Sequence, residues 1–115
     1  GTLSHERWRR YASPVWMDIN FSNTLNAKAA RENDDERHVC PMALDLIERA
    51  IQLWSNPGDV VFDPFSGIGS TGYQAIRMGR KFAGSELKTA YFEQAVKNIG
   101  SAKANQGALF DSEAV

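Results

Sequence analysis

The sequence predicts an α/β fold, half of a doubly wound sheet in which parallel strands are flanked by helices. Three observations carry this prediction: a short apolar, β-branched run at 59–63, a glycine-rich stretch at 66–72, and apolar residues at helical spacing on both sides. A strand, a crossover helix and a second strand normally form a right-handed parallel unit, so this order of segments predicts parallel pairing. The 115 residues leave room for one modest core.

A helix is predicted over residues 42–54. Its apolar side chains recur on one helical face, at Leu44, Ile47, Ile51 and Trp54. Pro41 suits the first turn, where a missing N–H group costs no hydrogen bond, and Asn-Pro-Gly at 56–58 ends the helix. We therefore expect one side of this helix to be buried.

Two strands and two further helices are expected after it. Residues 59–63 predict a strand buried on both faces, because the run is short, apolar and bounded by turn residues. A helix follows the glycine-rich stretch and ends near Gly79, and residues 81–86 predict the second strand. Thr89 can cap a last helix. The inner face of that helix is expected to carry Phe92, Ala95, Val96 and Ile99.

Composition divides the chain into a polar N-terminal segment at 1–36, a structured part at 37–104 and a flexible tail at 105–115. Within the first part, alternation over 15–21 predicts a short strand, and a helical turn is expected near 27–31. Arginines and aromatics interleave at Arg7, Trp8, Arg9, Arg10 and Tyr11. Such a pattern can bind a nucleic-acid backbone, although a solvated segment with one packed aromatic is the more ordinary interpretation.

The bulk properties limit the function classes. Thirteen basic and 14 acidic residues give a formal net charge of −1, so overall charge does not indicate nucleic-acid binding. Cys40 is the only cysteine, which excludes an internal disulfide and favours a reducing compartment. No apolar stretch approaches the length of a membrane span, and we expect a cytoplasmic protein. No metal site is predicted.

The glycine-rich stretch is the strongest functional signal, because it follows a predicted strand at the edge where open α/β sheets bind ligands. Gly67 and Gly69 would let a ligand approach the backbone, and the next helix offers free N–H groups. Glu86 ends the next strand, 19 positions after Gly67, where a carboxylate can accept hydrogen bonds from both hydroxyls of a ribose. These features predict a nucleoside site.

Two cofactors compete for this site. Residues 67–72 match the G-x-G-x-x-G fingerprint of dinucleotide sites, but Asp63, Pro64, Phe65 and Ser66 intervene between the apolar run and the first glycine. Asp63 would repel a pyrophosphate and attract the ammonium and sulfonium groups of S-adenosylmethionine, and Phe65 can add an aromatic face to a cation. Charge therefore favours S-adenosylmethionine, with a nicotinamide dinucleotide as the alternative.

The segment at 63–71, Asp-Pro-Phe-Ser-Gly-Ile-Gly-Ser-Thr, with Glu86 after it, resembles the cofactor motif of the DNA amino-methyltransferases, the adenine-N6 and cytosine-N4 class. His38-x-x-Pro41 ahead of the first helix resembles the block that precedes this motif in the subgroup with an N-terminal catalytic motif. The resemblance covers about residues 37–100. It implies a partial Rossmann-like methyltransferase fold that binds S-adenosyl-L-methionine, and a role in restriction-modification.

The resemblance also implies roles for individual residues. Asp63, Phe65 and Gly67 would lie near the methionine part of the cofactor, and Glu86 would hold the ribose. The remaining cofactor-binding residues implied are His38 and Pro41, which would close over the donor, and Gly69, Ser70 and Thr71 in the loop and helix. Val39 and Ile68 depart from the family pattern, which often has proline and a small hydroxyl residue there.

The family's catalytic motif, an Asp/Ser/Asn-Pro-Pro-aromatic string, does not occur in this chain; Ser13-Pro14-Val15-Trp16 is the nearest string. We therefore predict no catalytic residue here, a chain that is inactive alone, and DNA contacts through a remainder that includes the N-terminal catalytic half. The base-flipping pocket would lie there too. The third hypothesis, besides the two cofactor modules, is a non-catalytic piece that docks a partner.

Overall fold

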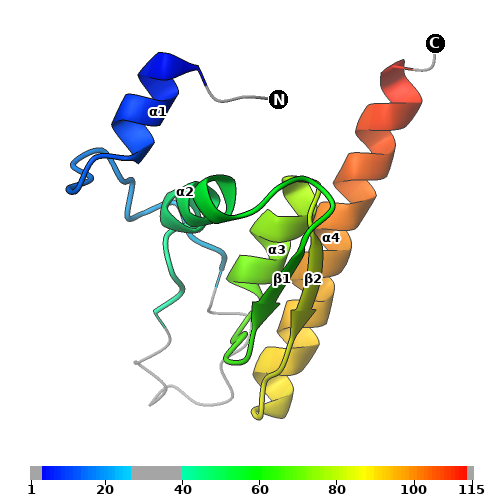
Figure 1. Ribbon diagram of the computed structural model, residues 1–115. Coiled ribbons are helices and arrows are strands. Elements are labelled where there is room, and N and C mark those ends of the chain that lie inside the picture. Colours follow the sequence, from blue (N-terminus) through cyan, green and yellow to red (C-terminus); the bar gives the residue numbers. More distant parts are fainter. Residues whose placement is uncertain (1–3, 27–39, 114–115) are drawn as a thin grey trace.

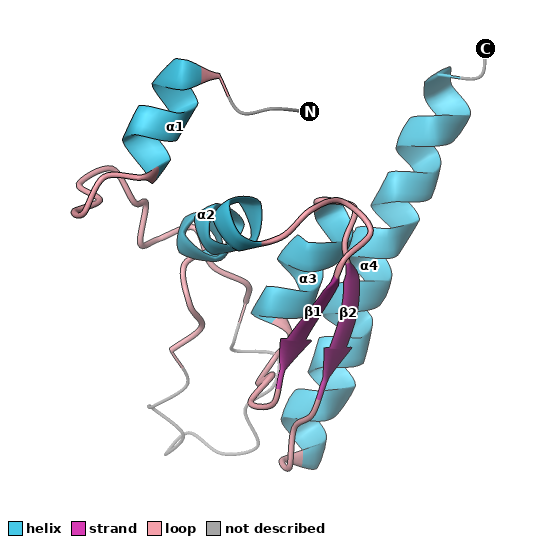
Figure 2. Cartoon of the chain, in the orientation of Figure 1, coloured by secondary structure: helices cyan, strands magenta, loops and turns pink. Residues whose placement is uncertain are grey.

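The computed structural model describes residues 4–26 and 40–113 of the chain (Figure 1). In this part, the elements follow one another as α1 (His5–Tyr11), α2 (Leu44–Trp54), β1 (Val60–Asp63), α3 (Ser70–Arg77), β2 (Lys81–Gly84) and α4 (Thr89–Glu113). Strands β1 and β2 pair in parallel, with Val61 opposite Phe82, and the helices flank them (Figure 2). The predicted α/β arrangement with parallel strands is confirmed.

The core lies between the two strands and helices α2 and α3. Ile47 and Ile51 of α2 pack with Ala75 of α3, and Val61 and Phe82 pack against this cluster from the strands. Ala75 is fully buried. Gly72 of α3 lies so close to the sheet that a Cβ atom there would come within 2.7 Å of the Phe82 ring. Only a glycine lets α3 lie this close to β2.

The opposite side of the strands is open in the described part of the chain. Val60 is 63% exposed and Phe62 is 68% exposed. The prediction that residues 59–63 form a strand buried on both faces is therefore wrong: α3 covers one face, and no described element covers the other. The apolar sequence of this strand is that of a parallel sheet enclosed by two layers, of which one is present here.

Several predicted boundaries shift in the structure. Residues 15–21 form no strand, and helix α1 lies ahead of them in a segment for which no helix was expected. Pro41 precedes α2 instead of occupying its first turn. The signal for the last helix fades after residue 100 in the sequence, yet α4 continues through Glu113. The helical turn expected near 27–31 lies outside the described residues.

The expected inner faces of two helices also need correction. Trp54, placed on the buried stripe of α2, is 77% exposed. On α4, Phe92 and Val96 are 51% and 57% exposed, whereas Ala95 and Ala102 are buried. The buried stripe of α4 is narrow and lined by small residues, because this helix packs closely against α3 and the glycine loop.

Arg80 joins the end of α2 to the start of β2. Its guanidinium is buried and donates hydrogen bonds to Ser55 Oγ (3.0 Å), to the Ser55 carbonyl (2.9 Å) and to the Met78 carbonyl (2.8 Å). Buried charged groups are tolerated where their hydrogen bonds are satisfied. The three bonds fix where β2 begins relative to α2.

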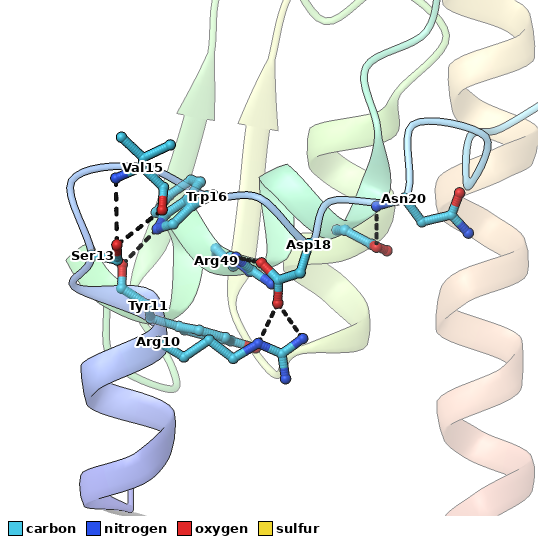
Figure 3. A network of polar contacts seen from close by, with 9 residues as sticks. Arg10, Tyr11, Ser13, Val15, Trp16, Asp18, Asn20 and Arg49 are labelled. Atoms are coloured by element: carbon cyan, nitrogen blue, oxygen red, sulfur yellow. Dashed lines mark hydrogen bonds and ion pairs between the residues drawn. The ribbon is translucent and has the colours of Figure 1, made fainter.

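A polar network around Arg49 ties the N-terminal segment to α2 (Figure 3). Arg49 is 4% exposed, and its Nη1 lies 2.7 Å from Asp18 Oδ1, while Arg10 pairs with the other carboxylate oxygen of Asp18. The guanidinium carbon lies 5.0 Å from the centre of the Tyr11 ring and 5.5 Å from that of Trp16. The arginine is thus enclosed by two aromatic rings and one carboxylate, which compensate its desolvation.

A second carboxylate extends this attachment. Asp45 of α2 accepts hydrogen bonds from the Asn20 N–H (3.1 Å) and from Asn23 Nδ2 (2.7 Å). The Asn23 carbonyl in turn accepts the Leu44 N–H at 2.8 Å, which satisfies a free donor at the start of α2. Leu25 can then pack against both the main core and Ile68 of the glycine loop.

We expect this attachment to weaken in acid. The bond from Arg49, aided by Arg10, holds the pKa of Asp18 well below its ordinary value of 3.8. A carboxyl group whose pKa is lowered by folding stabilises the folded state above its unfolded pKa, and this contribution is lost as the pH falls through the folded pKa. In urea unfolding, the difference in free energy of unfolding between the wild type and Asp18→Asn should be constant above about pH 5 and shrink below about pH 4.

The matched control is Glu48→Gln, which removes the charge of an exposed carboxylate on α2, the helix that carries Arg49. Its effect should stay small at every pH, as for most surface substitutions. A difference between Asp18→Asn and the wild type that does not change from pH 7 to pH 2 would contradict the lowered pKa of Asp18.

Candidate functional site

A cavity of about 310 Å³ opens at the carboxyl end of β1. Its walls come from the segment before α2, from the loop between β1 and α3, from the start of α3 and from the first turn of α4. The lining residues are Cys40, Pro41, Met42, Asp63, Phe65, Ser66, Gly67, Ile68, Ser70, Thr71 and Tyr91. The cavity therefore lies at the edge where parallel sheets bind ligands.

The β1–α3 loop is held over the end of β2 by hydrogen bonds to its backbone groups. Asp63 Oδ1 accepts the Phe65 N–H at 3.0 Å, which bends the chain directly after the strand. The Ser66 N–H donates to the Ser85 carbonyl at 2.9 Å, and Ser85 Oγ donates to the Pro64 carbonyl at 2.7 Å. The loop is thus attached to the residues that follow β2.

The two glycines of the loop serve different purposes. Both have a positive φ, +55° at Gly67 and +87° at Gly69, which disfavours other residues. A Cβ atom at Gly67 would meet no atom within 4 Å, so the backbone there faces open space. At Gly69 a Cβ atom would lie 3.1 Å from Ala95 of α4, so this glycine allows loop and helix to pack closely.

Glu86 fixes the shape of the loop from behind. Its Oε2 accepts the Gly67 N–H at 2.7 Å, and its Oε1 accepts the Lys88 N–H at 3.0 Å. Each carboxylate oxygen retains a further lone pair, and the side chain is half-buried, so Glu86 can still accept bonds from a ligand. The sequence placed Glu86 at this edge but gave no sign that it also binds the glycine loop.

Ile68 anchors the middle of the loop. It is 4% exposed, and Leu25 and Tyr91 pack against it. Its carbonyl accepts a hydrogen bond from Asn98 Nδ2 of α4 at 2.8 Å. The departure from the family pattern at this position therefore places a side chain in the core, where it connects the N-terminal segment to the loop.

Of the nine residues that the sequence nominated, six line the cavity: Pro41, Asp63, Phe65, Gly67, Ser70 and Thr71. Glu86 and Gly69 lie next to it, one bonded to Gly67 and the other packed beneath the loop. His38 lies outside the described residues. Phe65 is 86% exposed, so its ring is accessible to a ligand.

Sequence reasoning missed Met42, Tyr91 and Asn98. Tyr91 lies in the first turn of α4, which begins at the same edge of the sheet as α3. Its short separation from Glu86 in the sequence could therefore have indicated that it lies near the site. Asn98 lies two turns further along the same helix, and only the packing of α4 against the loop reveals its contact. In the part of the chain that the structure describes, no group of three metal-ligating side chains comes together.

The charges of the cavity suit a ligand with a cationic part. The half-buried Asp63 and the exposed Phe65 both line the cavity, and their carboxylate and aromatic ring attract positive charge. Ser70 begins α3, whose first N–H groups offer donors to acceptor atoms of a ligand. A ligand that carries both an ammonium group and a carboxylate, such as an amino acid, matches this pair of features.

The bonds of Glu86 can be tested without any ligand. Glu86→Ala removes both acceptors, so hydrogen exchange of the Gly67 and Lys88 amides should accelerate on the order of tenfold or more. The Gly58 amide, which donates to the Gly79 carbonyl at 2.9 Å away from the loop, should exchange at its wild-type rate. Unchanged protection of Gly67 in the variant would show that Glu86 does not hold the loop.

Comparison with known proteins finds DNA methylases and DNA methyltransferases among the relatives of this chain. Residues 3–97 match the family model described as DNA methylase. The chain is 45% identical over 58 residues to the type II methyltransferase M1.MboII of Moraxella bovis, and 41% identical over 64 residues to the DNA adenine methyltransferase YhdJ of Escherichia coli. These matches cover 50% and 56% of this chain and 22% of each relative. The chain thus spans about a fifth of the length of these curated relatives.

A solved structure agrees with these matches. TTHA0409 of Thermus thermophilus, a protein assigned as a DNA modification methylase and crystallised with S-adenosyl-L-methionine, superposes with a TM-score of 0.67 at 30% identity. The superposition covers 89% of this chain and 34% of that protein. The strands, the glycine loop and the flanking helices therefore have the arrangement found in that methylase.

Proposed function

Because the chain belongs to the DNA methylase family, we propose that it forms the S-adenosyl-L-methionine-binding part of an enzyme that methylates the exocyclic amino group of adenine (N6) or cytosine (N4). The observation that carries the proposal is the cavity at the end of β1, where Asp63 and Phe65 meet the glycine loop. The relative TTHA0409, which resembles this chain over 89% of its length, was crystallised with the same cofactor.

The cavity fits such a cofactor in size and charge. Its 310 Å³ lie at the lower end of the usual range for small-molecule sites. The cofactor carries an ammonium group and a sulfonium group, and Asp63 and Phe65 supply the carboxylate and the aromatic face that attract them. When bound, it supplies an activated methyl group on a positively charged sulfur.

A second, smaller cavity of about 60 Å³ adjoins the first at Ser66 and is lined in part by Glu86. S-Adenosyl-L-methionine lying across the glycine loop would place its amino-acid part beside Asp63 and the ribose of its nucleoside part beside Glu86. The bonds from the Gly67 and Lys88 amides hold the carboxylate of Glu86 in place, and its free lone pairs can accept the ribose hydroxyls.

The remaining nominated residues have supporting roles in this proposal. Gly67 lets the ligand approach the backbone, and Gly69 holds the loop against α4. Ser70 and Thr71 present hydroxyl and amide groups at the start of α3, and Pro41 lines the cavity from the segment ahead of α2. For His38, which lies outside the described residues, the family resemblance alone supports a part in covering the donor. These side chains bind and orient the cofactor; none is proposed to transfer a proton.

The nicotinamide-dinucleotide alternative is disfavoured by charge. A pyrophosphate at the start of α3 would face the carboxylate of Asp63 in the same cavity, and like charges repel most strongly where water is partly excluded. A lysine that would compensate this charge is not among the residues lining the cavity.

Catalysis and DNA recognition belong, in this proposal, to polypeptide outside these 115 residues, and we propose a cytoplasmic enzyme of restriction-modification. The catalytic Pro-Pro-aromatic motif does not occur in the sequence. Within residues 4–26 and 40–113, no helix is both long and apolar enough to cross a membrane.

Calorimetric titration tests cofactor binding. S-Adenosyl-L-methionine or its demethylated product should release or absorb heat on binding, and Glu86→Ala should weaken the affinity by roughly tenfold to a hundredfold, because it removes charged acceptors and loosens the loop. Glu93→Ala, which removes an exposed carboxylate from α4, is the matched control and should bind normally. If neither ligand binds at millimolar concentration while NADH does, the dinucleotide assignment replaces this one.

Methyl transfer tests the division of labour. The chain alone should transfer no tritiated methyl group to DNA, because the motif that holds the target amino group is missing from it. The positive control is a complete methylase of the same family under the same conditions. Turnover by the isolated chain would refute the proposed location of the catalytic residues.

A further inference from the structure

A cleft with aromatic walls lies between α1 and the last turn of α2. It measures about 320 Å³, and four of the residues that line it are aromatic: Trp8, Tyr11, Trp16 and Trp54. The first three come from α1 and the segment after it, and Trp54 ends α2. Trp8 is 52% exposed and Trp54 is 77% exposed, so both rings are accessible to a ligand. All three tryptophans of the chain thus line one cleft.

Helix α1 supplies positive charge on both sides of this aromatic face. With about 3.6 residues per helical turn, Trp8, Tyr11 and Ala12 share the face that lines the cleft, and Arg7 and Arg9 follow on either side of it. Both arginines are exposed, and neither forms an ion pair with another described residue. Three arginines against one glutamate give α1 a formal charge of +2, in a chain whose formal charge is −1. The surroundings of the cleft therefore attract anions.

Arg49 decides which kind of ligand suits these rings. Aromatic side chains around a pocket often bind a cation through their faces. Here the guanidinium carbon of Arg49 already lies 5.0 Å from the centre of the Tyr11 ring and 5.5 Å from that of Trp16 (Figure 3). With this charge beside the rings and the arginines of α1 around them, a second cation would be repelled. A planar ligand that carries negative charge suits both the rings and the arginines.

We propose that this cleft binds an unpaired nucleotide, whose base stacks on the exposed tryptophan rings and whose phosphate lies near Arg7 or Arg9. A base inside a duplex has no free face for an aromatic ring, so paired DNA is a poor ligand for this cleft. Every base has an aromatic face, so the contact carries no sequence information. Recognition of a target sequence therefore stays with polypeptide outside these 115 residues.

The cleft is separate from the cofactor cavity, because the two share no lining residue. A nucleotide in the cleft and a cofactor at the carboxyl end of β1 can therefore be bound at the same time. The inference goes beyond cofactor binding and does not depend on it. It gives a role to the interleaved arginines and aromatics of residues 7–11, since Trp8 lies half-exposed at a cleft instead of packing in the core.

Tryptophan fluorescence tests the cleft directly, because all three tryptophans line it. A short single strand of deoxythymidine should quench the emission, whereas a duplex of the same length should do so only at much higher concentration. Quenching by thymidine monophosphate alone would support the same site with a free nucleotide as its ligand, and quenching by the strand alone would support a strand as its ligand. In both cases the quenching should persist in the presence of millimolar S-adenosyl-L-methionine, because the two cavities are separate.

Substitutions separate stacking from charge, with affinities measured by the polarisation of a labelled single strand. Trp8→Ala should weaken binding by roughly fivefold to a hundredfold, and Trp8→Phe should restore most of the affinity, because phenylalanine keeps an aromatic face. Arg9→Ala should lower the slope of log affinity against log salt concentration by about 0.7, the share of one phosphate contact on a single strand. The matched controls are Phe21→Ala, which removes a ring that is 78% exposed outside the cleft, and Arg77→Ala on α3; both should bind like the wild type.

Three results would overturn the proposal: a duplex that binds as tightly as the single strand, an affinity that Trp8→Ala and Arg9→Ala both leave unchanged, or quenching by choline but not by nucleotides, which would make the cleft a cation site. Circular dichroism of each variant confirms that it has folded. Cofactor titration of the same samples keeps the two proposals apart. A chain that binds single strands but not S-adenosyl-L-methionine contradicts only the proposed function, and a chain with the opposite behaviour contradicts only the nucleotide cleft.

Discussion

The hydrogen bond between the Glu86 carboxylate and the Gly67 N–H is the contact on which the site depends. It joins the loop after β1 to the residues after β2, two points 19 positions apart in the chain. The bond from the Ser66 N–H to the Ser85 carbonyl joins the same two regions. The bond from Asn98 to the Ile68 carbonyl joins the loop to α4. Because these anchors engage the backbone, the loop keeps its shape before any ligand arrives. A ligand therefore does not have to supply the free energy of ordering it.

The N-terminal segment supports this loop from the other side. Arg49, enclosed by Tyr11, Trp16 and Asp18, holds the segment on α2 (Figure 3). Asp45 continues the attachment through Asn20 and Asn23. At the end of this line of contacts, Leu25 packs on Ile68. The buried guanidinium of Arg49 thereby contributes to the position of the glycine loop, because the segment that it holds on α2 ends at the apolar contact of Leu25 with Ile68.

Sequence patterns predicted what depends on neighbours in the chain. The parallel strands, the glycine loop with Gly67 and Gly69, and the place of Glu86 just after β2 all follow from short-range spacing. What the patterns could not predict depends on long-range packing. The apolar run at β1 predicts burial, but the layer that would cover Val60 and Phe62 is not among the described elements. In the same way, Trp54 fits the helical spacing of α2 and yet is 77% exposed, beside an apolar groove between α2 and β1. Alternation at 15–21 predicts a strand, but this segment is held on α2 by the contacts of Trp16 and Asp18 with Arg49, without a ladder of backbone hydrogen bonds.

Two of these differences, at Val60 and at Trp54, lie on one apolar groove of about 480 Å³ between α2 and β1. This groove adjoins the cavity at the carboxyl end of β1, because Met42 and Thr71 line both. A molecule in the groove would therefore contact side chains that also face a ligand in the cavity. Where binding at one place changes the affinity at the other, the coupling free energy is the same in both directions.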